Sequence, residues 1–163
     1  AVCSLAVVLG ASAALGEPSL RGRVVQFSVL TYDDPAAPIF QGVGETVMVG
    51  DGVEFGLRAE GAQNGVDVAP VEVDIQPSRI ELRYESGAGA LLGAVFNGYV
   101  LDFPNDCAVI KAAHIDAKAT SLPVTDANLF LSGPRLMINV QGLDYLQGSA
   151  IALDLELDDC PLS

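Results

Sequence analysis

Apolar and polar side chains alternate with a period of two residues along most of the chain after Gly16. The alternation is clearest in the segments 71–75 (VEVDI), 80–85 (IELRYE) and 151–158 (IALDLELD). Because successive side chains of a strand point to opposite faces, each of these strands has one apolar face and one charged face. This pattern is typical of antiparallel sheets that cover a core on one side and meet water on the other.

Further strands are expected in five segments, which are 24–30, 53–57, 95–103, 110–119 and 136–141. Turn-forming residues separate the strands, at 50–52, 86–87, 104–106, 132–134 and Gly142. The segment 60–67 is expected to be an exposed loop, and 126–131 is compatible with one turn of helix.

Many short strands between turns predict an all-β fold, specifically a two-sheet antiparallel β-sandwich that is jelly-roll-like. The chain has 163 residues, of which 50% are hydrophobic, so a sizeable core can be buried. The sequence contains neither an internal repeat nor a long linker, so we expect a single domain over residues 17–163.

The first sixteen residues are uncharged, apolar and rich in small residues, and they include Ala11-Ser12-Ala13, a pattern that signal peptidase favours. We therefore expect residues 1–16 to be a signal peptide that forms a hydrophobic leader helix. The segment lacks an initiator Met and a basic region, so the leader is expected to be truncated. A membrane anchor is the alternative, although a helix needs about 20 apolar residues to span a bilayer. We expect an exported protein, whether periplasmic, at the cell surface or extracellular, with no stable membrane span once the leader is removed.

Two cysteines, Cys107 and Cys160, remain after the leader with its Cys3 is removed. Thiols oxidise in exported proteins, so we predict a disulfide between Cys107 and Cys160. Closing so long a loop would stabilise the fold by roughly 4 kcal/mol. Two separate buried thiols are the alternative.

The charge of the chain limits its partners. Acidic residues number 21 and basic residues 8, which gives a formal net charge of -13. Such a field repels phosphate backbones and anionic lipid headgroups, so nucleic acid is not an expected partner. An excess of acidic residues of this kind is typical of secreted proteins, in which it increases solubility.

No set of catalytic residues is evident in the sequence. The single histidine, His114, is expected on the solvent face of its strand beside Asp116, with Ala113 and Ile115 on the opposite face. The chain has no Gly-x-Ser-x-Gly elbow that would place a serine against this imidazole. Nucleophilic catalysis is therefore not predicted.

Neighbouring carboxylates are the remaining candidates for chemistry, and they occur at Asp33-Asp34, Asp102-Asp106 and Asp158-Asp159. Such pairs can hydrolyse glycosides, but with 21 acids close pairs arise by chance. Calcium binding is conceivable at Asp33-Asp34 or Asp158-Asp159, although the chain contains no Asp-x-Asp-x-Asp-Gly loop. No other cofactor is predicted, and the absence of tryptophan argues against a lectin-like aromatic platform.

Three stretches together resemble a known family: VGDGVEF at 49–55, FNGYVLDF at 96–103 and INVQGLDY at 138–145. In order and spacing, and with the strand-like VEVDIQPSRIEL at 71–82, they are similar to the secreted β domain of bacterial PEP-CTERM (exosortase-associated) surface proteins. The resemblance implies export and a role at the cell surface or in extracellular matrix, in a family without an established enzymatic activity, and it supplies no catalytic residues to transfer. After residue 157 the chain shows no Val-Pro-Glu-Pro motif, hydrophobic helix or basic tail, so the resemblance is to the domain without its sorting tail.

Glycines in these stretches are expected to serve the fold. Gly50 and Gly52 suit a tight turn, Gly142 suits the end of a strand, and Gly98 suits a strand that bends or closely approaches another backbone.

The sequence therefore favours an exported, non-enzymatic module with a structural or adhesive role, whose partner is a surface protein or polysaccharide. The alternative is a carbohydrate-binding or carbohydrate-active protein that uses carboxylates on a sheet face.

Overall fold

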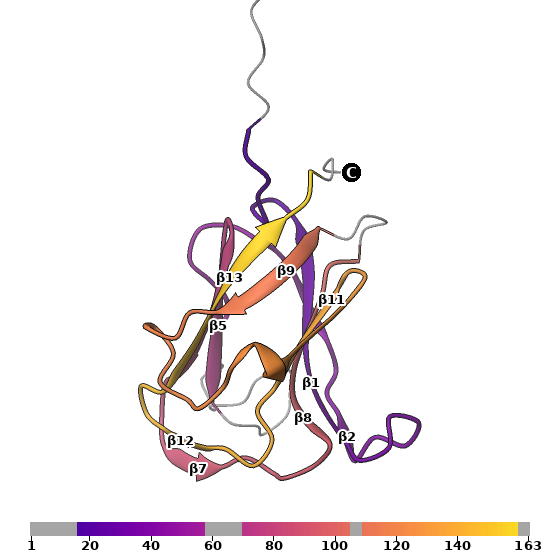
Figure 1. The fold of residues 1–163 in the computed structure, drawn as a ribbon, viewed down its shortest axis with the longest axis vertical. Coiled ribbons are helices and arrows are strands. Elements are labelled where there is room, and N and C mark those ends of the chain that lie inside the picture. The colour runs from indigo at the N-terminus through magenta and orange to yellow at the C-terminus, as the bar shows by residue number, and fades with distance from the viewer. Residues whose placement is uncertain (1–15, 58–69, 105–108, 160–163) are drawn as a thin grey trace, which may run out of the picture.

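The computed structural model describes residues 16–57, 70–104 and 109–159, and their fold is all-β with antiparallel strand pairing throughout (Figure 1). Residues 1–15 of the predicted leader 1–16, the predicted loop 60–67 and the cysteines Cys107 and Cys160 lie outside the described residues. In the part of the chain that is described, no helix is long and apolar enough to cross a membrane.

Six strands form the larger of the two main sheets. Its order is β10 (Leu129–Ser132), β11 (Arg135–Asn139), β8 (Phe96–Asp102), β1 (Val24–Tyr32) and β2 (Phe40–Gln41), and β3 (Glu45–Met48) also pairs with β1. The longest register is that of β1 with β8, which runs from Gln26 opposite Asp102 to Tyr32 opposite Phe96.

Five strands form the second main sheet, in the order β4 (Val53–Phe55), β5 (Val71–Gln76), β6 (Arg79–Tyr84), β13 (Ala150–Leu157) and β9 (Ile110–Ile115). A two-stranded sheet of β7 (Ala88–Ala90) and β12 (Asp144–Leu146) lies at one end of the molecule (Figure 1). The one described helical element is η1 (Asp126–Asn128), a single 3-10 turn.

The strands predicted from the alternation are present, with shifted ends. The predicted strand 110–119 ends at Ile115, because the Asp116 carboxylate accepts the N–H of Lys118 at 3.0 Å and starts a turn. The helical turn predicted over 126–131 is wrong beyond Asn128, since β10 begins at Leu129. Five strands of two to four residues were not predicted, and they are β2, β3, β7, β10 and β12.

Alternate side chains of both main sheets meet in one core. Phe27 of β1 packs against Phe55 of the other sheet with ring centroids 5.1 Å apart, and against Tyr99 at 5.8 Å. Phe27 is fully buried, and burial of one such ring contributes about 1.5–3 kcal/mol to folding. Aromatic packing of this kind therefore holds the two sheets to each other.

A hydrogen bond between two tyrosines also crosses this core. The hydroxyls of Tyr84 on β6 and Tyr99 on β8 lie 2.8 Å apart, and both side chains are buried. Burial raises the pKa of Tyr84 to about 12 and raises the pKa of Tyr99 well above its ordinary value. Both hydroxyls stay protonated at neutral pH, so that one donates a hydrogen bond to the other across the core.

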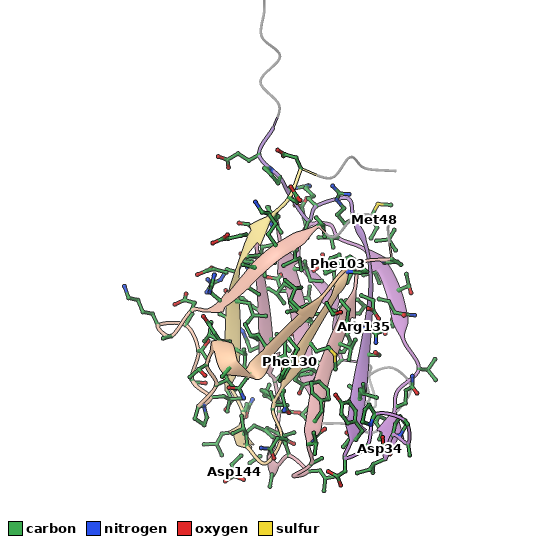
Figure 2. The ribbon with its side chains drawn as sticks, turned by 45° about the vertical axis from the view of Figure 1, so that its right-hand side comes forward. Asp34, Met48, Phe103, Phe130, Arg135 and Asp144 are labelled. Carbon is green, nitrogen blue, oxygen red and sulfur yellow. The ribbon has the colours of Figure 1, made fainter. Side chains whose placement is uncertain are left out.

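The outward face of the six-stranded sheet is more apolar than the alternation suggested. On β8, Tyr99 belongs to the core, whereas Phe96 lies on the opposite face and is still only 2% exposed. Its ring packs between Tyr32 at 5.4 Å and Phe130 at 6.4 Å, and Figure 2 labels Phe130 on the β10–β11 hairpin. This central strand is therefore buried on both faces.

Gly98 on β8 has no room for a side chain. A Cβ atom at this position would overlap the backbone carbonyl oxygen of Ile138 on β11. The expectation that Gly98 permits a close backbone approach is confirmed, and the tight approach follows from glycine's lack of a Cβ.

We predict that replacing Tyr84 by Phe costs about 1–3 kcal/mol of unfolding free energy, because the buried Tyr99 hydroxyl loses its partner. Replacing both tyrosines by Phe should cost less unfolding free energy than the sum of the two single changes, because the double variant leaves no unpaired hydroxyl in the core. Urea denaturation of the wild type, both single variants and the double variant measures this coupling. Additive costs would contradict the prediction.

Candidate functional site

A pocket of about 470 Å³ lies between the six-stranded sheet and the two-stranded sheet. We call it the Thr31–Asn97 pocket, and its lining residues are Val29, Thr31, Phe40, Pro70, Ala90, Leu91, Leu92, Asn97, Gly98, Tyr99, Val140 and Tyr145. Figure 2 shows Asp144, on β12, at the same end of the molecule as Asp34, which follows β1. None of the described residues that line this pocket carries a charged side chain.

Two buried polar side chains form part of the pocket wall. Thr31 and Asn97 are directly opposite each other on β1 and β8, and the Thr31 hydroxyl donates to the Asn97 Oδ1 at 2.8 Å. The Asn97 Nδ2 donates to the carbonyl oxygen of Leu92 at 2.8 Å. Thr31 is 4% exposed and Asn97 is 9% exposed. The pair is therefore held in a single arrangement by the sheet and by the segment after β7.

Aromatic rings form another part of the wall. Tyr145 of β12 stacks on Tyr84 with ring centroids 4.7 Å apart. Gly89, opposite Tyr145 on β7, lies so close to it that an added Cβ would be 3.0 Å from the ring. The small residue on β7 thus allows the Tyr145 ring to lie against the two-stranded sheet.

The outer face of the five-stranded sheet carries a second, smaller hollow of about 230 Å³. We call it the acidic pocket, and its lining residues are Val53, Glu72, Asp74, Glu81, Arg83 and Glu85. Asp74 and Glu81 are direct cross-strand neighbours, a like-charge arrangement that is unfavourable unless cations compensate it. Arg83 supplies part of that compensation, since its Nη2 lies 3.2 Å from Glu81.

Arg79, next to the acidic pocket on β6, binds three carboxylates. Its guanidinium contacts Glu81 at 2.8 Å, Asp154 at 2.6 Å and Asp116 at 3.0 Å, and its side chain is 21% exposed. The hydrogen bond that Arg79 donates to Glu81, followed by those that it donates to Asp154 and Asp116, raises the pKa of Arg79 above its ordinary value. Hydrogen bonds from the backbone N–H of Lys118 and, to a lesser extent, from the Arg79 side chain lower the pKa of Asp116. Glu81, Asp116 and Asp154 therefore have a structural role as partners of Arg79.

Comparison with known proteins assigns this chain to no family. No protein-family model matches the sequence, and no curated protein or solved structure shows significant similarity to it. Its function must therefore be inferred from its own residues.

His114 lies on the exposed face of β9, as predicted, but its partner is not Asp116. Its Nδ1 lies 3.0 Å from Asp126 of η1, and its Nε2 lies 3.8 Å from Glu156. The other oxygen of Asp126 accepts the backbone N–H of Ile115 at 2.7 Å. The hydrogen bond to Asp126 raises the pKa of His114 and lowers the pKa of Asp126. This pair ties η1 to β9.

The carboxylate pairs singled out in the sequence do not converge on a site. Asp33 accepts the N–H of Val95 and Asp34 that of Ala36, each at 2.9 Å. Asp102 forms a bidentate ion pair with Arg135 at 2.7 and 2.9 Å. Asp158 accepts the N–H of Asp159 at 3.0 Å, and Asp106 lies outside the described residues. Within the described ranges, no three His, Cys, Asp or Glu side chains are grouped to hold a metal ion.

We predict a pH-dependent contribution from the His114–Asp126 pair. The raised pKa of His114 gives stability that is present below its ordinary value of 6.5 and is lost as pH rises through the folded-state value. The lowered pKa of Asp126 gives stability that is present above 3.8 and is lost as pH falls through its folded-state value. The contribution should therefore be greatest between these two ordinary values.

The variant Asp126→Asn tests this prediction, because its amide oxygen can still accept the Ile115 N–H while the charge is lost. We expect its Tm deficit to be larger at about pH 5 than at about pH 9. The chain has one histidine, so the imidazole NMR titration needs no assignment. A His114 pKa that is equal in both proteins would contradict the pairing.

Proposed function

We propose that this chain is an exported, non-enzymatic module with a structural or adhesive role in the periplasm, at the cell surface or in extracellular matrix. One observation carries the non-enzymatic part: the described lining of the Thr31–Asn97 pocket contains no carboxylate, imidazole, amine or guanidinium. General acid–base and nucleophilic catalysis use such groups within reach of the substrate. A pocket of this composition suits binding.

Three features of the sequence support export and a surface location. The leader-like residues 1–16, the pair Cys107 and Cys160, and the resemblance of 49–55, 96–103 and 138–145 to the secreted PEP-CTERM-type domain each favour it independently. The net charge of -13 favours solubility outside the cell and disfavours nucleic acid as a partner.

We propose further that the fold is a two-sheet, jelly-roll-like β-sandwich. Support comes from contacts that join the two main sheets, above all Phe27 with Phe55 and Tyr84 with Tyr99. In Figure 1, β13, β9 and β5 lie to one side of β1, β8 and β11, as two facing layers would.

Export is tested by fractionating the source organism with antibodies against the purified domain. We expect the protein in the envelope or the medium, and we expect its intact mass to rise by two hydrogen atoms on reduction, because Cys107 and Cys160 are predicted to be bridged. Reduction should also lower the unfolding free energy by roughly 4 kcal/mol. An exclusively cytoplasmic location would overturn the proposed function, and an unchanged mass would overturn the disulfide.

The acidic pocket is the observation that favours the second candidate, a carbohydrate-active protein. Glu72 and Glu85 both line it, as glycosidase carboxylates line their clefts. Because Arg83 and Arg79 already bind Glu81, we expect no hydrolysis of soluble polysaccharides by the wild type. A reducing-sugar assay measures this, with Glu72→Gln and Glu85→Gln as variants. If the wild type hydrolyses a polysaccharide and Glu72→Gln or Glu85→Gln abolishes that activity, the protein is an enzyme and the non-enzymatic proposal is refuted.

A further inference from the structure

The Thr31–Asn97 pocket has hydrogen-bonding capacity that the fold does not use. In the described structure the Thr31 hydroxyl donates once, which leaves its oxygen free to accept. The Asn97 Nδ2 donates one proton to Leu92, which leaves a second proton, and its Oδ1 can accept once more. A donor and two acceptors thus stand together, with the two oxygens 2.8 Å apart.

Apart from Thr31 and Asn97, the described side chains that line the pocket are uncharged, and they are aliphatic or aromatic apart from Gly98. Phe40, Tyr99 and Tyr145 are the aromatic residues of this lining, and most other lining residues are aliphatic. A volume of about 470 Å³ lies within the range of about 300–1,000 Å³ that is usual for small-ligand sites. The ligand that fits therefore combines an apolar surface with closely spaced hydroxyl groups and bears no charge.

We propose that the Thr31–Asn97 pocket binds a neutral sugar residue of a polysaccharide, an inference that rests on the proposed surface function and names its ligand. The C–H face of a pyranose packs on aromatic rings, and its neighbouring hydroxyls both donate and accept, as Thr31 and Asn97 require. An acidic sugar is disfavoured, because the described lining offers no cation and the chain has a net charge of -13. An alkyl chain would leave the free donor of Asn97 unpaired.

The position of the pocket suits a tethered module. The end of β13 and the described segment that leads into β1 lie at the end of the molecule opposite β7 and β12 (Figure 1). The pocket, beside β7 and β12, therefore lies at the opposite end of the molecule from the end of β13.

Two exposed leucines provide a matched pair of variants. Leu92 lines the pocket and is 57% exposed, whereas Leu146 does not line it and is 66% exposed. Neither change removes a core side chain, so Leu92→Glu and Leu146→Glu should both fold. We expect Leu92→Glu to weaken sugar binding roughly tenfold or more, because the carboxylate must be desolvated beside the ligand. Leu146→Glu should bind as the wild type does.

The polar pair is tested by Thr31→Val, which keeps the side-chain shape and removes the hydroxyl. We expect a roughly two- to tenfold loss of affinity, from the loss of one hydrogen bond to the sugar. Circular dichroism and Tm establish that the variant is folded before binding is measured.

The probes are an array of neutral and uronic-acid oligosaccharides, followed by isothermal titration of the full chain with the neutral oligosaccharide that binds best. Neutral binding that Leu92→Glu loses and Leu146→Glu retains supports the proposal. Equal binding by all variants, preference for uronic acids, or binding only of an apolar peptide control would each overturn it. If the protein is recovered from the envelope but binds no sugar, the sugar proposal alone is overturned. If the protein is located only in the cytoplasm, the proposed function is overturned.

Discussion

The packing of inward-facing side chains from the two main sheets into one core is the constraint on which the other features depend. On β1 the inward row is Val25, Phe27, Val29 and Thr31, and on β8 it is Leu101, Tyr99 and Asn97. The last members of these two rows are polar and face each other. The alternation of side chains along each strand, which builds the core, therefore also places Thr31 and Asn97 in the wall of the pocket.

The outward faces of the two main sheets differ for a related reason. β8 is a central strand, and its outward Phe96 is covered by Tyr32 and Phe130, so this face carries an aromatic cluster. The five-stranded sheet instead places acids on its outward face and balances several of them with Arg79 and Arg83. With 21 acids against 8 bases, these few arginines are shared among several carboxylates.

Alternation was sufficient to predict the long strands, because a half-buried strand repeats its pattern over five or more residues. It failed for β2, β3, β7, β10 and β12, which are too short for a period to be recognised. At β10, the stretch after Asp126 looked helical, but pairing of Leu129 with Ile138 and of Phe130 with Met137 holds it as a strand.

The pocket could not be predicted, because Thr31 and Asn97 are 66 residues apart and only the register of β1 with β8 brings them together. The partner of His114 was missed for the same reason. Asp116 is close to it in sequence, whereas Asp126 reaches it through the turn η1. One sequence signal was present, since Thr125 and Asn128 form a capping box that starts η1 at Asp126.

The position of Asp126 has a consequence for how copies of this protein behave at high density. Among the strands that the structure describes, β9 pairs only with β13, so the Ile115 N–H that Asp126 accepts lies on the outer edge of this sheet. Open edges are templates on which a strand of a second molecule can add. By occupying one donor of this edge with a side chain and covering it with η1, the fold hinders the addition of a strand from a crowded neighbour, so that copies of the protein can be concentrated without fusing into fibres.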